Sequence, residues 1–346
     1  FLVHKLWNRA FLKEEETVSD VKGEGKTGND FHDKVITTFL DEYKGTKELK
    51  IPKGYAFPHE PYLMQRYVAY KATSVKSRYF ANTSEPGAGK TLSAILASRV
   101  MNAKTTLVLC PKNVIGQWGD KIKEIFPDSE VIIRNKVFSI SKSVKNPRYL
   151  ILNYDIFNQQ TSGKKIAIFK KIKIDFVIMD EIQFAKAPLK KNIDEETSRS
   201  RRLHLENSLK YIKENNPKSR RLGLSATPII NTLKEGRSLL ELLSGRNHNH
   251  VKTDDRFFFN GVGMYEQLTN ISIRQRNGQN FKIEKHPPVI VDAPITSPFS
   301  ELEQNPLLIE LELTDARISE IIKKIEGQTI IYTEYVGKGK INTNIV

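Results

Sequence analysis

The segment from Tyr79 to Ala97 follows the order strand, glycine-rich loop, helix. Its loop reads Glu85-Pro86-Gly87-Ala88-Gly89-Lys90-Thr91 and lies between an apolar run and a helical pattern. In such a context glycines let backbone N–H groups approach phosphate oxygens, and the helix N-terminus adds partial positive charge. Ser84 stands where the longest form of this motif has its first glycine, but the shorter form Gly-x-Gly-Lys-Thr is met. We expect a phosphate-binding loop here, with an ordinary tight turn as the alternative.

Short apolar runs alternate with amphipathic stretches from about residue 51 to residue 245. We expect strands at Arg78–Ala81, Thr106–Cys110, Val131–Ile133, Tyr149–Leu152, Phe176–Met179 and Arg221–Leu224. We expect helices at Thr91–Met101, Val114–Phe126 and Leu203–Asn215. Continuous apolar strands that alternate with helices are typical of a parallel sheet covered on both faces, with ligands at the carboxyl ends of the strands. The predicted fold class is therefore α/β with a parallel sheet.

Two carboxylates follow the apolar run Phe176–Met179 directly, in the order Asp180-Glu181. Asp180 can hold Mg²⁺ directly or through a water molecule, and Glu181 can orient and polarise an attacking water. In the phosphate-binding loop, Lys90 would reach the β- and γ-phosphates and Thr91 would place its hydroxyl on Mg²⁺. Acidic residues also cap strands without any such role, but the loop upstream favours a site for a nucleoside triphosphate and magnesium.

A third apolar strand ends in Ser225-Ala226-Thr227-Pro228. Small polar residues beside the carboxylates can hydrogen-bond to them and respond to the state of the nucleotide. By itself the segment is only a strand followed by a turn.

Composition excludes several classes of protein. No run approaches about 20 apolar residues, so we expect no transmembrane helix, and the first residues do not resemble a signal peptide. The single cysteine, Cys110, excludes an internal disulfide and a cysteine-based zinc site. We therefore expect an intracellular protein, cytoplasmic or, in a eukaryote, nuclear, with no membrane partner.

The formal net charge is +15, from 55 Lys and Arg against 40 Asp and Glu. A field of this sign favours polyanionic partners, nucleic acid above all, although a solubilising surface would look the same. Basic residues gather in 164–173 and 199–221 with few aromatic residues among them, which favours contacts to a duplex backbone over base stacking. A solvated helix face explains these charges equally well.

Taken in order, these motifs resemble the first RecA-like domain of superfamily-two helicases and, within them, the Swi/Snf-like branch. The set is Gln65, Gly-Ala-Gly-Lys-Thr, Leu107–Lys112 with Trp118, Ile151–Tyr154, Asp180–Gln183 and Ser225–Asn231. Two features depart from the branch: it usually has Thr-Gly-Thr where this chain has Ser-Ala-Thr, and a longer acidic and glycine-rich lead into the loop.

The resemblance implies a DNA-dependent ATPase that uses ATP and Mg²⁺. It implies that Gln65 selects adenine, that Gly87, Ala88, Gly89, Lys90 and Thr91 bind the phosphates, and that Thr91 and Asp180 hold the metal ion. Lys90, Asp180, Glu181 and Gln183 would be catalytic, Ser225, Ala226 and Thr227 would couple hydrolysis to motion, and Pro111, Lys112, Asn153 and Tyr154 would contact nucleic acid. Gln65, Lys112 and Asn153 are also ordinary residues for an exposed helix or loop.

The expected organisation is an N-terminal extension over 1–50, a first RecA-like domain over 51–250, a connector over 251–325, and the start of a second RecA-like domain over 326–346. Within these we expect a loop at Val21–Asp30, little regular structure from 250 to 310, a helix at Asp315–Ile325 and a strand at Gln328–Thr333.

The predicted function is translocation along double-stranded DNA driven by ATP hydrolysis, in a remodelling, restriction-defence or viral transcription machine. Two alternatives stay open: a nucleoside triphosphatase or helicase subunit that acts in transcription or on RNA, and a non-catalytic DNA-binding scaffold. In this superfamily the second lobe supplies arginines to the γ-phosphate, and Gln328–Val346 contains none. We therefore expect these 346 residues alone to hydrolyse ATP slowly, unless Arg274 or Arg276 completes the site.

Overall fold

The computed structural model describes residues 2–25, 28–73, 78–139, 144–157, 166–185 and 194–276. The expected helix at Asp315–Ile325, the expected strand at Gln328–Thr333 and the whole expected second lobe lie outside these ranges.

A parallel sheet of seven strands forms the centre of the described fold, in the order β3-β4-β2-β5-β6-β1-β7. The strands are β1 Tyr79–Asn82, β2 Thr105–Cys110, β3 Glu130–Ile133, β4 Arg148–Asn153, β5 Phe176–Asp180, β6 Arg220–Leu224 and β7 Ser272–Ile273. The first six confirm the expected strands to within one or two residues. The seventh was not expected; it pairs with β1, so the sheet continues past residue 250.

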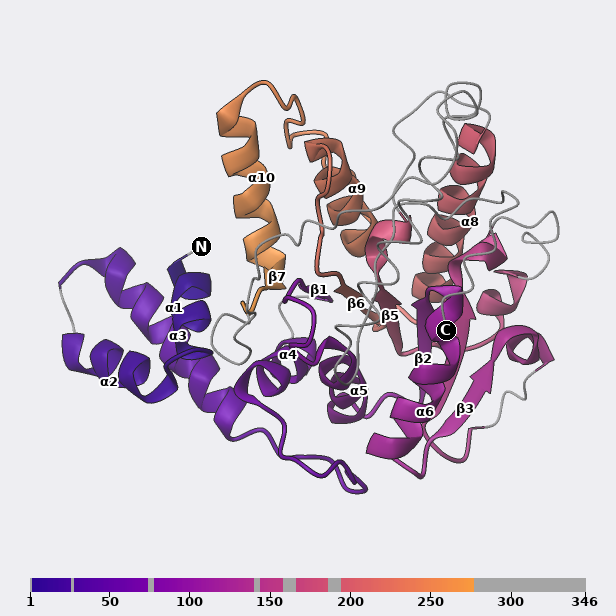
Figure 1. Ribbon diagram of the computed structural model, residues 1–346, viewed down its shortest axis with the longest axis horizontal. Helices are drawn as coiled ribbons and strands as arrows, with labels where there is room; N and C mark the ends of the chain where they lie inside the picture. Colours follow the sequence, from indigo (N-terminus) through magenta and orange to yellow (C-terminus); the bar gives the residue numbers. More distant parts are fainter. Residues whose placement is uncertain are drawn as a thin grey trace, which may run out of the picture. The chain divides into compact units, whose positions relative to one another are not determined.

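Helices connect most of these strands (Figure 1). The α-helices are α1 Leu2–Ala10, α2 Glu14–Glu24, α3 Asp30–Lys47, α4 Leu63–Thr73, α5 Lys90–Val100, α6 Ile115–Ile125, α8 Asp194–Asn215, α9 Leu233–Ser244 and α10 Phe258–Ile271. Short 3₁₀ helices are η1 Lys112–Val114, η2 Arg134–Ser139, η3 Tyr154–Phe157, η4 Ala167–Lys170 and η5 Ile182–Ala185. The helices expected before β2, before β3 and before β6 are confirmed as α5, α6 and α8, the last with an earlier start.

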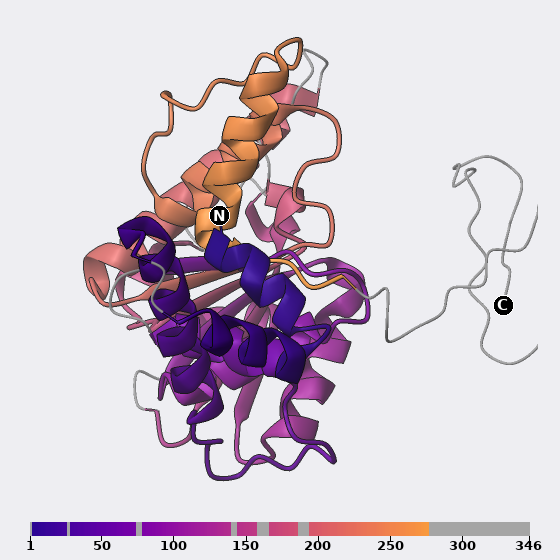
Figure 2. The same cartoon turned by 90° about the vertical axis from the view of Figure 1, so that its left-hand side faces the viewer.

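Two expectations were wrong. Helix α2 runs to Glu24, into the segment predicted as a loop, because Val21 packs into the core with 2% of its surface exposed. The segment predicted to be irregular after residue 250 contains α10, whose inner face buries Met264 and Leu268. Helix α10 packs against α9, which lies beside it in Figure 1 and Figure 2. This packing stabilises a helix that the local sequence does not predict.

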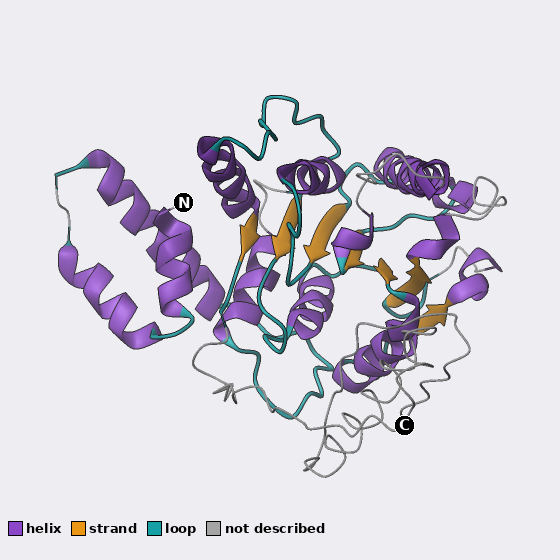
Figure 3. Cartoon of the chain, turned by 45° about the horizontal axis from the view of Figure 1, so that its top comes forward, coloured by secondary structure: helices purple, strands orange, loops and turns teal. Residues whose placement is uncertain are grey.

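Alternating residues of each strand enter two separate cores. In β2, Val108 and Cys110 join the core formed with α4, α5 and α6, whereas Leu107 and Leu109 join the core formed with α8, α9 and α10. Figure 3 shows the resulting layers, with the strands between two sets of helices. Burial on both faces is the reason why these strands are continuous apolar runs.

The N-terminal helices pack against α4 through an aromatic cluster. The Trp7 ring lies 4.0 Å from Tyr67 and 5.3 Å from Phe39, measured between ring centroids. The carboxylate of Glu42 accepts hydrogen bonds from Trp7 Nε1 at 2.9 Å and Tyr67 at 3.1 Å, and pairs with Lys71 at 2.7 Å. The N-terminal helices therefore pack against α4, the helix that contains Gln65.

Candidate functional site

Three loops meet at the carboxyl edge of the sheet, after β1, β5 and β6. Strand β6 lies between the other two, and its last residue, Leu224, is in register with Asn82 of β1 and Asp180 of β5. The loop after β1 is the glycine-rich segment, the loop after β5 begins with Glu181, and the loop after β6 begins with Ser225. The fold thus brings the three sequence motifs together, with Ser-Ala-Thr in the middle.

Glycine is required at the end of the glycine-rich loop. Gly87 and Gly89 have φ values of +79° and +78°, in the left-handed region where other residues are strained. Gly89 is the residue that precedes α5, and a Cβ there would lie 2.2 Å from Nε2 of Gln65. The close approach of α4 to this turn therefore depends on the missing side chain.

Gln65 is held at this position by α4. Its side chain is 4% exposed, and its Oε1 accepts a hydrogen bond from the backbone N–H of Tyr62 at 2.9 Å. The structure therefore places Gln65, the residue expected to select adenine, beside the glycine-rich loop, and it excludes the alternative of an exposed helix glutamine.

Buried side chains hold the start of the loop. Asn82, fully buried, accepts from the Ser84 N–H at 3.1 Å and donates to the Ser93 hydroxyl of α5 at 3.1 Å. The Ser84 hydroxyl accepts from the Gln275 N–H at 2.9 Å. The residue that replaces the first glycine of the motif is thus an anchor to the segment after β7.

Lys90 begins α5 and folds its ammonium group back over the loop. Its Nζ donates to the carbonyl of Ser84 at 2.9 Å and to that of Glu85 at 3.2 Å. Burial lowers the pKa of Lys90, while the Glu181 and Asp180 carboxylates oppose that change. The ammonium group therefore lies within electrostatic range of both acidic residues. Thr91 follows it in the first turn of the helix.

Asp180, at the end of β5, is held by Trp118 of α6. The indole Nε1 donates to Oδ2 at 2.8 Å, and the Glu181 N–H donates to Oδ1 at 3.1 Å. Burial raises the pKa of Asp180, and the Trp118 hydrogen bond and Lys90 partly offset that rise. A buried carboxylate of this kind suits a cation, since a positive charge nearby would stabilise its ionised form.

Glu181 adopts a left-handed conformation with φ of +47°, which is uncommon for a residue with a side chain. Gln183 donates a hydrogen bond from Nε2 to its carboxylate. Within the described ranges, the other amide atom of Gln183, Oε1, is buried and has no hydrogen-bond partner. Strained backbone and an unsatisfied polar atom are features that cluster at functional sites.

The Ser-Ala-Thr loop is tied to the end of β1 and to Arg274. The N–H of Ser225 donates to the Asn82 carbonyl at 3.2 Å, and the buried Ser225 hydroxyl accepts from the Thr227 N–H at 3.1 Å. The carbonyl of Ala226 accepts from Arg274 Nη1 at 3.4 Å, and the same guanidinium lies 3.9 Å from Glu85. Arg274 therefore bridges the loops after β6 and β1.

The residues expected to contact nucleic acid differ in exposure. Lys112 is exposed on η1 after β2, next to the half-buried Pro111. Asn153, at the end of β4, is half-buried and donates to Asp155 at 2.9 Å. Tyr154 is 3% exposed, and its hydroxyl donates to the Asp180 carbonyl at 2.9 Å. The side chain of Tyr154 lies in the core and supports the acidic loop, and the contact of this residue with nucleic acid stays a prediction.

Several residues of the site were not predicted as such. The sequence offered Arg274 as one of two arginines that could complete the site. It did not predict a role for Asn82 or the hydrogen bond from Trp118 to Asp180. Asn82 directly after an apolar strand and before the glycine-rich loop was the available signal, since a polar side chain at that point must find buried partners. Cys110 is buried, which raises its pKa to about 12, so it carries no reactive thiolate.

Comparison with known proteins decides the family. The SNF2-related domain family matches residues 83–260, just over half of the chain. The chain belongs to the SNF2-related family. The match begins just after β1 and ends inside α10, so it contains all three loops of the site.

Other comparisons add less. Among solved structures, the "Sulfolobus solfataricus SWI2/SNF2 ATPase core in complex with dsDNA" matches 67% of this chain and 47% of its own, with 16% identity and a TM-score of 0.49. The chain thus spans about half the length of that protein. No curated protein matches the chain. No helix in the ranges described combines the length and the apolar character needed to cross a membrane.

Proposed function

We propose that the chain binds ATP at the carboxyl edge of its sheet, hydrolyses it with Mg²⁺, and couples hydrolysis to movement along double-stranded DNA. Membership of the SNF2-related family supports the reaction class. One observation carries the site: Lys90, both acidic residues and the Ser-Ala-Thr loop lie at one edge of the sheet, with Gln65 packed beside Gly89.

On nucleotide binding, the phosphates would replace the loop's own carbonyls as hydrogen-bond partners of Lys90. The carbonyls of Ser84 and Glu85 hold the Lys90 ammonium group in place, and phosphate oxygens would replace them as its partners. The N–H groups of the turn from Gly87 to Gly89 and the start of α5 would bind the same phosphates. Gln65, already against this turn, would hydrogen-bond to adenine.

The residues that would hold Mg²⁺ are Asp180 and the hydroxyl of Thr91, both oxygen donors of the kind this cation prefers. When bound, the ion neutralises charge on the phosphates and orients them. Trp118 keeps one oxygen of Asp180 fixed by its hydrogen bond at 2.8 Å. Glu181, oriented by Gln183, would position the attacking water and accept its proton.

The loops after β1, β5 and β6 would couple ATP hydrolysis to nucleic-acid binding. Ser225 contacts the end of β1, Ala226 contacts Arg274, and Tyr154 contacts the carbonyl of Asp180. Lys112 and Asn153, at the ends of β2 and β4, would bind the backbone of the duplex on this same edge. A change in the nucleotide site would therefore move residues next to the nucleic-acid contacts.

The test is steady-state ATP hydrolysis of the chain with duplex DNA, single-stranded DNA, RNA or no nucleic acid. Duplex DNA should raise the rate most, and Lys90→Ala should lower it by at least about 10²-fold, since removal of one preorganised charge contact commonly costs that much. Equal rates for the wild type and Lys90→Ala would overturn the assignment of the site.

The same experiment separates the alternatives. Stimulation by RNA alone would indicate a helicase or triphosphatase that acts on RNA or in transcription. Binding of DNA without any hydrolysis dependent on Lys90 would indicate a scaffold. A small stimulation by duplex DNA fits a remodelling or restriction machine in which a second RecA-like lobe, and other subunits, would raise the rate, whereas strong stimulation of these residues alone would mean that an arginine such as Arg274 completes the site.

A further inference from the structure

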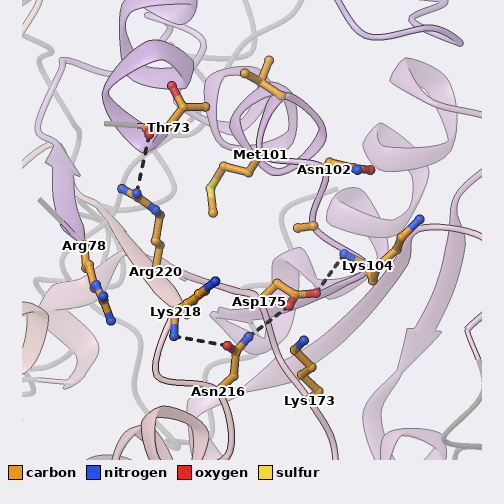
Figure 4. Close-up of a pocket in the computed structure, with 12 residues that line it drawn as sticks. Thr73, Arg78, Met101, Asn102, Lys104, Lys173, Asp175, Asn216, Lys218 and Arg220 are labelled. Atoms are coloured by element: carbon orange, nitrogen blue, oxygen red, sulfur yellow. Dashed lines mark hydrogen bonds between the residues drawn. The ribbon is translucent and has the colours of Figure 1, made fainter. Parts of the chain in front are cut away.

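The opposite edge of the sheet contains a cavity of about 630 Å³ that the nucleotide site does not use. It lies where the strands begin, between the end of α4, the turn after α5 and the loops that lead into β5 and β6. Figure 4 shows its lining, which is Thr73, Arg78, Val100, Met101, Asn102, Ala103, Lys104, Lys173, Asp175, Asn216, Lys218 and Arg220. Parallel strands all start at one edge, so the segments that lead into β1, β2, β5 and β6, far apart in sequence, contribute to one surface.

The lining is strongly cationic. Three lysines and two arginines stand against a single carboxylate, that of Asp175. This carboxylate is already engaged: its Oδ2 accepts from the N–H groups of Lys104 at 2.9 Å and Thr105 at 3.1 Å, and its Oδ1 accepts from Asn216 at 3.0 Å. Asp175 therefore ties the floor of the cavity together, and its one negative charge stands against five positive charges.

The lysines of the cavity are exposed and form no ion pair with any described carboxylate; they are Lys104, Lys173 and Lys218. Arg220 is half-buried, and burial together with the nearby Arg78 lowers its pKa. Like charges from four segments thus converge around a single carboxylate, and a bound anion would relieve their repulsion.

The positive surface continues beyond this cavity. A second, smaller cavity of about 200 Å³ shares Arg78 and adds Lys213, Arg221 and Arg246. Tyr79 is the one aromatic residue in either lining. A surface with several cations and little aromatic area suits a chain of phosphates, since base stacking on single strands needs aromatic platforms.

We propose that the amino edge of the sheet is a second nucleic-acid contact, at which Arg78, Lys104, Lys173 and Lys218 bind phosphates of a duplex backbone. It shares its ligand class with the proposed function but neither its residues nor its edge of the sheet, and it needs no ATP. The two contacts would hold nucleic acid at opposite edges of one domain.

The experiment is a fluorescence anisotropy titration of a short duplex, without nucleotide, over a series of salt concentrations. The variant combines Lys104→Gln, Lys173→Gln and Lys218→Gln. Its matched control removes the same charge from exposed lysines elsewhere by Lys22→Gln, Lys34→Gln and Lys53→Gln. Thermal unfolding of both variants checks that they fold.

The slope of log affinity against log salt should become shallower by about 2–3 in the cavity variant, because each phosphate contact contributes about −0.9. The control should keep the wild-type slope, and basal ATP hydrolysis should be unchanged in both. An unchanged slope in the cavity variant would overturn the proposal. So would a variant that loses binding of inorganic tripolyphosphate but keeps its duplex affinity, because the cavity would then be a site for small anions. Failure of Lys90→Ala to reduce hydrolysis would contradict the proposed function and leave this result standing.

Discussion

Substitution of Gly89 by alanine tests the geometry of the nucleotide site most sharply. The new Cβ would lie 2.2 Å from Nε2 of Gln65, and the residue would keep a φ of +78°. The steric clash and the backbone strain both arise from the added Cβ atom of residue 89. The rest of the glycine-rich loop keeps its sequence.

The cost can be worked from these two effects. A residue with a side chain in the left-handed region costs about 1–2 kcal/mol. Displacement of Gln65 breaks its hydrogen bond with the N–H of Tyr62, worth about 0.5–1.5 kcal/mol. The free energy of unfolding should therefore fall by about 2–3 kcal/mol, which corresponds to a fall in Tm of roughly 4–12 °C for a domain of this size.

The assay is thermal unfolding of Gly89→Ala with and without Mg·ATP. The variant should unfold earlier and should gain little stability from ATP, because both the turn and Gln65 are displaced. Gly116→Ala is the matched control: this glycine lies in α6, and a Cβ there would meet nothing within 4 Å. Its Tm should stay level or rise slightly, since alanine is the better helix former.

A double variant separates the two causes. With Gln65→Ala added, the clash disappears and only the backbone cost remains, so the two effects should be less than additive by about 1 kcal/mol. A Gly89→Ala protein with the wild-type Tm and the wild-type response to ATP would refute the left-handed turn and its contact with α4.

Three further outcomes are expected. Glu181→Gln should bind ATP with near wild-type affinity but hydrolyse it at least about 10²-fold more slowly, so that bound nucleotide remains as ATP. If the variant no longer binds ATP, the role of Glu181 is structural. Because burial raises the pKa of Asp180 when folded, its ionised form costs stability at neutral pH. Without Mg²⁺, the Tm of Asp180→Asn minus that of the wild type should therefore increase from acidic pH to pH 7, and a difference that is independent of pH would contradict this reasoning. Arg274→Ala should lower turnover about tenfold or more while Arg276→Ala, an exposed neighbour, should not; equal effects would mean that the contacts of Arg274 with Ala226 and Glu85 are incidental.

Most of the sheet could be predicted because its strands are buried on both faces. Val108 and Leu109 face different cores, so the sequence of β2 has no polar alternation, and glycine-rich or polar turns bound each run. The three loops of the site could be predicted together for the same reason, since parallel strands bring their carboxyl ends to one edge.

The remaining parts depend on contacts between segments far apart in sequence. Helix α10 begins at Phe258, with Phe259 largely exposed, and its contacts with α9, β1 and β7 explain the helix. Arg274 follows a strand of two residues, too short to give a pattern, and its position between Glu85 and Ala226 is set by the pairing of β7 with β1. Tyr154 was expected to contact nucleic acid because Asn153-Tyr154 resembles a motif of the family, and the sequence does not show that its ring is buried.

The central claim is that Gln65, the glycine-rich loop and Lys90 form one ATP site. Equilibrium titration of the chain with Mg·ATP and Mg·GTP tests it most directly, with Lys90→Ala and Gln65→Ala as variants. We expect saturable binding that favours ATP over GTP in the wild type. Lys90→Ala should bind both nucleotides more weakly, and Gln65→Ala should keep binding but lose the preference for ATP. Binding of ATP that neither substitution changes would contradict it.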